Sequence, residues 1–205
     1  MASNSAETPI TVLGIDPGSR RTGYAVLVQR GNRYEALTLG VIKAEKLEDH
    51  ADRLQFIYDE IEALIQRYEP DFCAIETPVY GKDPLAMLKL GRAQAACMLA
   101  MVRRNLPVTE YYPKAIKKSI TGNGSASKEQ VAYMLQRLLG LSASEAEKFS
   151  NDATDALAIA WCHAMRRNDI AAGNQKQSDI AIKKGRGRGH SAWGDFVASN
   201  PDRIK

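Results

Sequence analysis

Three strand-like runs stand near the start of the chain with only short breaks between them, and this order limits the fold more than any other feature. The runs cover residues 11–16, 22–29 and 34–42. The breaks, DPGSRR and RGN, are rich in turn-forming residues, and short breaks of this kind are typical of hairpins. The chain is therefore expected to begin as an antiparallel meander.

The spacing of apolar residues changes after residue 42. Between residues 54 and 68 they recur every three or four positions, which predicts an amphipathic helix that Pro70 ends. From there, strand patterns alternate with helical ones. We expect strands at residues 71–76 and 107–112, and helices at residues 84–104, from Pro113, after the capping-box pair Ser127 and Gln130, and at residues 151–166. This order predicts an α/β fold with a five-stranded mixed sheet and helices on both faces.

Composition separates one globular domain, residues 9–168, from a different kind of segment after it. Of the 205 residues, 44% are hydrophobic and 25% are charged, which is ordinary for a globular protein. From residue 169 to residue 205 the sequence becomes polar and includes the basic, glycine-rich stretch KKGRGRGHS. We expect residues 169–205 to form a largely disordered tail.

No sequence feature indicates a membrane protein or a secreted one. No apolar run approaches the roughly 20 residues needed to span a bilayer. The first ten residues, MASNSAETPI, lack the basic and hydrophobic regions of a secretory signal. Cys73, Cys97 and Cys162 are isolated and have neither zinc nor redox spacing. These features predict a cytoplasmic protein with reduced cysteines and no membrane partner.

Two of the predicted strands end on a carboxylate. Asp16 closes the first strand, and Glu76 closes the strand at residues 71–76. A helix-linked sheet would place these strands side by side and parallel, so both carboxylates should emerge at the same edge. Asp152 and Asp155 share one face of the first turn of the last helix and could reach that edge. The simpler alternatives are that Asp16 only starts a turn and that the helix dipole favours the other two.

Four carboxylates in one partly buried site repel one another strongly. They can all remain ionised only if cations lie among them, and ligation by oxygen alone selects Mg²⁺, with Mn²⁺ as a substitute. Two such ions about 4 Å apart cleave phosphodiesters, one activating water and the other stabilising the leaving oxygen. We therefore expect Asp16, Glu76, Asp152 and Asp155 to bind two Mg²⁺ ions and to be catalytic.

Several separate motifs resemble, in order and spacing, the RuvC family of bacterial Holliday junction resolvases. They are GIDPGSRRTGYAV, AIETP, MLKLGRAQ, GNGSASKEQV and NDATDALAIA, and the similarity extends over residues 12–163. The resemblance implies an RNase H-like fold, a homodimer, and Mg²⁺-dependent nicking of opposed strands of four-way junction DNA during recombination and DNA repair. It also implies 5′-phosphate ends, action alongside the RuvA–RuvB branch-migration complex, and catalytic acids at Asp16, Glu76, Asp152 and Asp155.

A basic segment follows Glu76 in the sequence. Residues 81–128 contain two acids, Asp83 and Glu110, and nine bases that include Arg103 and Arg104. Such a segment is a candidate DNA-binding surface, and the alternative is a set of solvated helix faces. We expect contacts to DNA phosphates from Lys82, Lys89 and Arg92, which lie in or near the loop and helix after Glu76. We expect further contacts from the residues that match a basic stretch of the family, Lys114, Lys117, Lys118 and Lys128.

The loop after Glu76 departs from the family pattern. The family often has an aromatic residue three positions after this glutamate, where it stacks on a base at the junction. This chain has Val79 at that position and Tyr80 after it. We expect Tyr80 to stack on an unpaired base, and the alternative is a tyrosine folded onto the domain. The helix at residues 84–104 is rich in small residues and is expected at the dimer interface.

Three other functions fit parts of the sequence. Sugar-kinase and actin-like ATPases also begin with a GIDxG strand and turn, but they need a second such domain, and this chain has no second glycine-rich phosphate loop. Another RNase H-like nuclease and a non-catalytic DNA-binding relative would share the predicted fold. The four acids favour an active enzyme. The basic segment and the small-residue helix favour the junction nuclease.

Overall fold

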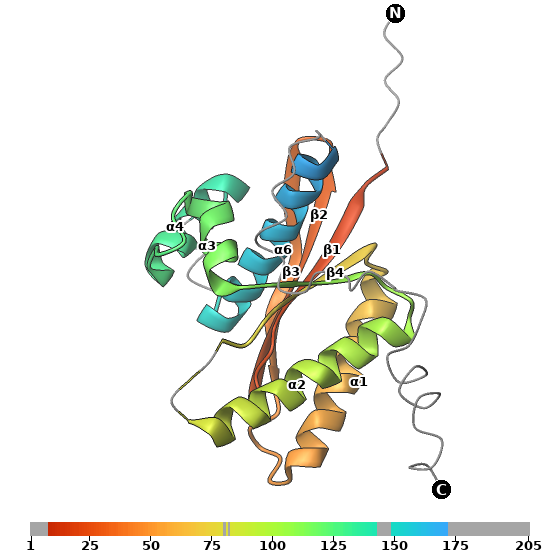
Figure 1. The fold of residues 1–205 in the computed structure, drawn as a ribbon. Coiled ribbons are helices and arrows are strands. Elements are labelled where there is room, and N and C mark those ends of the chain that lie inside the picture. Colours follow the sequence, from red (N-terminus) through yellow and green to blue (C-terminus); the bar gives the residue numbers. More distant parts are fainter. Residues whose placement is uncertain (1–7, 80, 82, 143–148, 172–205) are drawn as a thin grey trace, which may run out of the picture.

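One five-stranded sheet forms the centre of the protein (Figure 1). The computed structural model describes residues 8–79, 81, 83–142 and 149–171. The order of the strands across the sheet is β3-β2-β1-β4-β5. The first three strands are antiparallel neighbours, β4 is parallel to β1, and β5 is parallel to β4, which confirms the predicted mixed sheet. The strands are β1 (Ile10–Asp16), β2 (Arg21–Arg30), β3 (Arg33–Lys43), β4 (Phe72–Glu76) and β5 (Val108–Tyr111).

Helices cover both faces of this sheet, as predicted. On one face lie α1 (His50–Tyr68) and α2 (Pro84–Arg103). On the other lies α6 (Asn151–Ala171), with α3 (Pro113–Thr121) and α4 (Lys128–Leu139) beside it. Helix α1 begins before residue 54, where its apolar pattern starts, because Asp49 caps it by accepting a hydrogen bond from Ala51 N at 2.6 Å.

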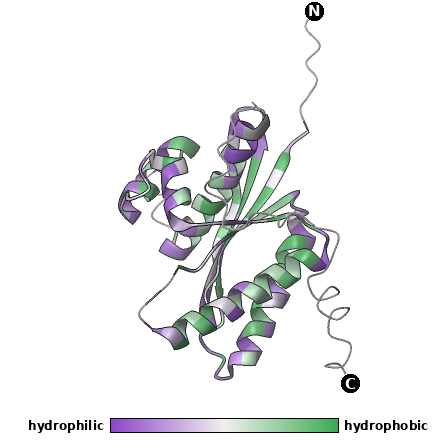
Figure 2. Ribbon diagram, viewed as in Figure 1, coloured by the Kyte–Doolittle hydropathy of each residue, from purple (hydrophilic) through white to green (hydrophobic). Residues whose placement is uncertain are grey.

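The alternating side chains of β1 divide the core into two apolar clusters. Leu13 and Ile15 are fully buried in the cluster beneath α1 and α2. Val12 points to the opposite face and is buried in the cluster that contains α6. A strand buried on both faces reads as a nearly continuous apolar run, which explains the sequence VLGI. In Figure 2 the helices alternate between apolar and polar residues, as expected of helices with one face on a core.

The predicted capping box is present at the start of α4. Gln130 N donates a hydrogen bond to Ser127 Oγ at 3.3 Å, and Ser127 N donates one to Gln130 Oε1 at 2.9 Å. These bonds satisfy two backbone groups that a helix start otherwise leaves without partners. They also fix the first turn of α4, which begins with Lys128.

The C-terminal helix continues beyond the predicted domain boundary at residue 168. Helix α6 ends at Ala171. Residues 172–205, which make up most of the predicted tail, lie outside the described residues, so the disordered tail stays a prediction.

Helix α6 lies close to β1 and β2 at two glycines. A Cβ atom built on Gly14 would lie 2.3 Å from the backbone oxygen of Ala156 and 2.7 Å from the nitrogen of Ala160. A Cβ atom on Gly23 would lie 2.0 Å from the backbone oxygen of Asp152. Because the clashing atoms belong to the helix backbone, a side chain at either position would displace the helix. The two glycines therefore set how deeply α6 packs onto the sheet.

Replacing Gly14 by alanine is expected to lower the free energy of unfolding by about 1–3 kcal/mol, which is the usual cost of overpacking a core. Gly91→Ala on α2 is the control, because no atom lies within 4 Å of its Cβ position and alanine in a helix is favoured over glycine by about 1 kcal/mol. Urea unfolding of both variants measures the difference. Equal stability of Gly14→Ala and the wild type would contradict the close packing of α6.

Candidate active site

The C-terminal ends of β1 and β4 bring two carboxylates to one edge of the sheet. The strands pair in parallel, with Ile15 opposite Ile75. The next residues, Asp16 and Glu76, therefore end neighbouring strands at the same edge, and both are partly buried. This is the placement expected from the order of the strands in the sequence.

The turn after Asp16 is held by another residue. Thr22 Oγ1 donates a hydrogen bond to the Gly18 carbonyl at 2.8 Å and accepts one from Gly18 N at 3.3 Å. Among the residues that the structure describes, the Asp16 carboxylate takes no part in the hydrogen bonds of this turn. The alternative in which Asp16 serves only to start a turn is therefore not supported by the geometry.

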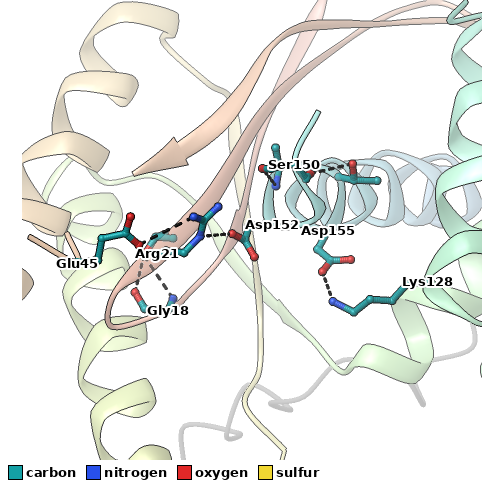
Figure 3. A network of polar contacts seen from close by, with 10 residues as sticks. Gly18, Arg21, Glu45, Lys128, Ser150, Asp152 and Asp155 are labelled. Carbon is teal, nitrogen blue, oxygen red and sulfur yellow. Dashed lines mark hydrogen bonds and ion pairs between the residues drawn. The ribbon is translucent and has the colours of Figure 1, made fainter. Parts of the chain in front are cut away.

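Asp152 and Asp155 come from the first turn of α6, which is capped by Ser150 (Figure 3). Ala153 N donates to Ser150 Oγ at 3.4 Å, and Thr154 N donates to the Ser150 carbonyl at 3.0 Å. The cap therefore does not depend on either aspartate. Both carboxylates extend from the helix toward side chains of other elements.

Each of these aspartates binds a cationic side chain. Arg21 Nε donates a hydrogen bond to Asp152 Oδ2 at 2.8 Å, and Lys128 Nζ donates one to Asp155 Oδ2 at 2.5 Å. The hydrogen bond to Asp155 raises the pKa of Lys128 above its ordinary value. Sequence reasoning did not identify Arg21, which also lies 3.9 Å from Glu45. In the sequence, the one feature that marks Arg21 is its position beside the turn that follows Asp16.

Burial and mutual repulsion raise the pKa of the two strand-end acids. The pKa of Asp16 rises to about 7, first because burial disfavours its charged form and then because of the charges of Asp155 and Asp152. The pKa of Glu76 also rises to about 7, through burial and then through the charges of Asp16 and Asp155. Lys128 opposes both shifts. The acids thus form one electrostatic group that the cations of the chain neutralise only in part.

The donor set of the site fits a hard divalent cation. The four acids offer only oxygen ligands, which Mg²⁺ and Mn²⁺ prefer. Burial and then mutual repulsion raise the pKa values of Asp16 and Glu76, and a bound cation would oppose this effect. Within the described ranges, no group of three or more His, Cys, Asp and Glu side chains has the arrangement of a metal site. In the structure Asp152 and Asp155 are paired with Arg21 and Lys128.

Four of the predicted DNA-binding lysines lie on α3 and at the start of α4. Lys117 and Lys128 are close enough to the site for their charges to lower the pKa of Glu76. Lys114 and Lys118 are exposed on α3. These lysines therefore form a basic surface that adjoins the acids.

The remaining predicted DNA contacts are more distant or lie outside the described residues. Lys89 and Arg92 are on α2, where their charges lower the pKa of His50 at the start of α1, after the larger effects of burial and of Arg53. Tyr80 and Lys82 lie outside the described residues. The stacking role of Tyr80 therefore stays a prediction.

In the metal-free protein, the free energy of unfolding is expected to fall as the pH rises from about 4 to about 7. The pKa values of Asp16 and Glu76 are about 7 in the folded protein, against ordinary values of 3.8 and 4.5. Over this window the unfolded chain loses these protons more readily than the folded protein does, so rising pH favours unfolding. Below the window both states hold the protons, and above it neither does.

The double variant Asp16→Asn with Glu76→Gln should lose this dependence, and urea unfolding in EDTA across the same pH range measures it. Burial lowers the pKa of His163 to about 4, so this residue acts in the opposite sense, but it does so in both proteins and cancels in the comparison. If the free energy of unfolding changed equally with pH in the wild type and in the double variant, the raised pKa values of Asp16 and Glu76 would be contradicted.

Comparison with known proteins identifies the family. The family model described as Crossover junction endodeoxyribonuclease RuvC matches residues 12–163. A protein of this name from Salinibacter ruber is 45% identical over 193 residues, which cover 94% of this chain and 98% of the relative. Another from Bacteroides fragilis is 44% identical over 194 residues, 95% of each chain.

Solved structures agree with this match. The structure of Thermus thermophilus RuvC in complex with a Holliday junction substrate superimposes with a TM-score of 0.72 at 30% identity, covering 82% of this chain and 98% of that one. The yeast mitochondrial Holliday junction resolvase Ydc2 shares the fold, with a TM-score of 0.62 at 17% identity over 80% of this chain and 82% of that one. The fold is thus the expected RNase H-like one, and the chain belongs to the RuvC family of crossover junction endodeoxyribonucleases.

Proposed function

We propose that this protein resolves Holliday junctions by metal-dependent nicking of opposed DNA strands. The observation that carries the proposal is the grouping of Asp16, Glu76, Asp152 and Asp155 at one edge of the sheet. The similar protein from Thermus thermophilus has been solved with a Holliday junction substrate, which supports the same substrate here. Hydrolysis with two metal ions, 5′-phosphate products and cooperation with the RuvA–RuvB complex complete the proposal.

The four carboxylates would hold the metal ions from two sides. Asp16 and Glu76 are fixed by the paired ends of β1 and β4, whereas Asp152 and Asp155 come from the opposite side on α6. When bound, Mg²⁺ or Mn²⁺ ions supply an activated water and stabilise charge on the leaving oxygen. Since the pKa values of Asp16 and Glu76 are about 7, both acids bind metal more readily at alkaline than at acidic pH.

The basic surface beside the acids is suited to DNA phosphates. Lys117 and Lys128 lie nearest the site, and Lys114 and Lys118 extend the surface along α3. Contacts of this kind give affinity without sequence information and weaken as salt rises. We therefore assign junction binding mainly to these lysines and catalysis to the acids.

Asp16→Asn and Glu76→Gln are each expected to abolish junction cleavage while leaving junction binding intact. Loss of a metal ligand removes several kcal/mol of transition-state stabilisation, which corresponds to about a thousandfold or more in rate. Cleavage is measured on a synthetic four-way junction and on a matched duplex, with Mg²⁺ and with EDTA, and binding is measured in EDTA.

Glu60→Gln on the exposed side of α1 is the control, because it removes an exposed carboxylate that is not one of the proposed ligands. It should cleave like the wild type. Loss of junction binding in step with cleavage in the Asp16 and Glu76 variants would show that these acids are structural. Cleavage by the wild type in EDTA, or equal cleavage of junction and duplex, would contradict the proposed function.

Helix α2 supplies the proposed dimer interface, mainly through exposed leucines and less through the small residues that the sequence analysis emphasised. The small residues Ala93 and Ala100 face inward and are fully buried. The outward side is an apolar stripe at intervals of three and four, interrupted only by an arginine, and its exposed leucines and valine are between 56% and 63% exposed. We define the α2 stripe as Leu85, Leu88, Arg92, Ala95, Leu99 and Val102.

A second copy of the chain is the partner that best fits the α2 stripe. By length and composition α2 is the one helix among the described residues that could cross a membrane, but its inner side is already packed in the core of the domain. A two-fold axis through the middle of the stripe would pair the helices antiparallel, with Leu88 against Leu99 of the partner subunit. Arg92 would face Ala95 of the partner subunit. This pairing would place Arg92, which is also a predicted DNA contact, at the proposed interface.

Leu88→Glu and Leu99→Glu are expected to convert the dimer into a monomer, because each places two unpaired carboxylates in an apolar contact. Analytical ultracentrifugation measures the change. Leu138→Glu on α4 is the control, since Leu138 is also exposed, at 42%, but lies on another helix. A wild-type protein that is monomeric at micromolar concentration and still cuts paired strands would contradict the interface.

A further inference from the structure

Arg21 lies between two carboxylates at the edge of the candidate metal site (Figure 3). Its Nε donates a hydrogen bond to Asp152 Oδ2 at 2.8 Å, and its Nη1 lies 3.9 Å from Glu45 Oε2. The proposed function gives Arg21 and Glu45 no role. Their position beside one of the four site acids calls for an explanation.

A backbone hydrogen bond keeps Glu45 close to Arg21. Arg21 is the first residue of β2, and Ala44 N donates a hydrogen bond to the Arg20 carbonyl at 2.9 Å. This bond ties the segment that carries Glu45 to the start of β2. Glu45 is therefore a second acceptor held within reach of the guanidinium.

The guanidinium of Arg21 and a metal ion would both be attracted to the charge of the Asp152 carboxylate. Oδ2 of Asp152 is directed to the start of β2. Consistent with this orientation, the charge of Asp152 raises the pKa of Asp16 less than the charge of Asp155 does. Arg21 thus partly neutralises the Asp152 carboxylate and fixes its orientation, and a cation that binds among the acids has to overcome both effects.

We propose that Arg21 is a positioning residue that competes with the metal ion for Asp152. In the metal-free protein it holds the carboxylate at the rim of the site, and when the metal binds, the guanidinium stays with Glu45. The pair thereby sets the metal concentration at which the site fills. This inference rests on the metal site of the proposed function.

The competition should be modest. The Arg21 side chain is 42% exposed and the Asp152 side chain 34%, and ion pairs with this exposure are weak because water and salt screen them. Removal of Arg21 should therefore tighten metal binding by about two- to fivefold. Weak competition from Arg21 also suits a site that must bind its metal ions readily.

The test measures Mn²⁺ binding to the full chain without DNA, by electron paramagnetic resonance at about pH 8. Arg21→Gln should bind Mn²⁺ about two- to fivefold more tightly than the wild type. Arg20→Gln is the matched control. It removes the same charge one residue earlier, and within the described ranges the Arg20 side chain forms no ion pair. Arg20→Gln should therefore change the affinity less than Arg21→Gln does.

A substitution at Glu45 should change the Mn²⁺ affinity in the opposite direction from Arg21→Gln. Glu45→Gln removes the second acceptor and should weaken Mn²⁺ binding while Arg21 is present. In the Arg21→Gln background the same change should have a smaller effect, and the difference between the backgrounds measures the coupling. In nitrogen-edited NMR spectra, the Arg21 Nε–H signal should shift when Mg²⁺ is added, because its acceptor changes.

Equal Mn²⁺ affinities of Arg21→Gln and Arg20→Gln, or an Arg21 Nε–H signal that does not respond to Mg²⁺, would overturn the role of Arg21 and leave the metal site intact. Absence of Mn²⁺ binding in the wild type and in every variant would overturn the metal site itself, and the proposed function with it. The two failures are therefore distinguishable in one experiment.

Discussion

The contact between the backbone of α6 and the first two strands determines where the other parts of the site can lie. It depends on Gly14 and Gly23, where a single methyl group would meet the helix backbone. At this depth the first turn of α6 reaches the edge where β1 and β4 end, so acids more than a hundred residues apart in sequence meet. The apolar cluster around α6 stabilises this contact, because it buries both the helix and one face of the sheet.

The same contact concentrates negative charge, and this opposes folding. Burial and repulsion raise the pKa of Asp16 and Glu76 to about 7, so their ionised forms are costly in the metal-free protein. Lys128 and Arg21 neutralise part of the charge from the two sides of the site. A divalent cation would complete the neutralisation, which links stability, metal binding and catalysis to one group of carboxylates. The two apolar clusters provide the stability that such a site requires.

The fold and the placement of the acids were largely predictable, and the ion pairs were not. Asp16 and Glu76 end strands whose parallel pairing follows from the helix between them, so topology alone placed them together. The bond between Arg21 and Asp152 joins residues 131 positions apart and depends on how deeply α6 packs, which no local pattern encodes. The proposed interface helix was singled out by its composition, but three of its small residues, Ala93, Ala96 and Ala100, are buried in the core of the domain. Its outward leucines are visible only once the helix is placed.

Anomalous diffraction from crystals of this protein soaked in Mn²⁺ tests the central claim most directly. Our account predicts two anomalous peaks about 4 Å apart among the carboxylates of Asp16, Glu76, Asp152 and Asp155. Asp152 should then have left Arg21. Crystals in which these four acids bind no Mn²⁺, while the ion pairs of Asp152 and Asp155 persist, would contradict it.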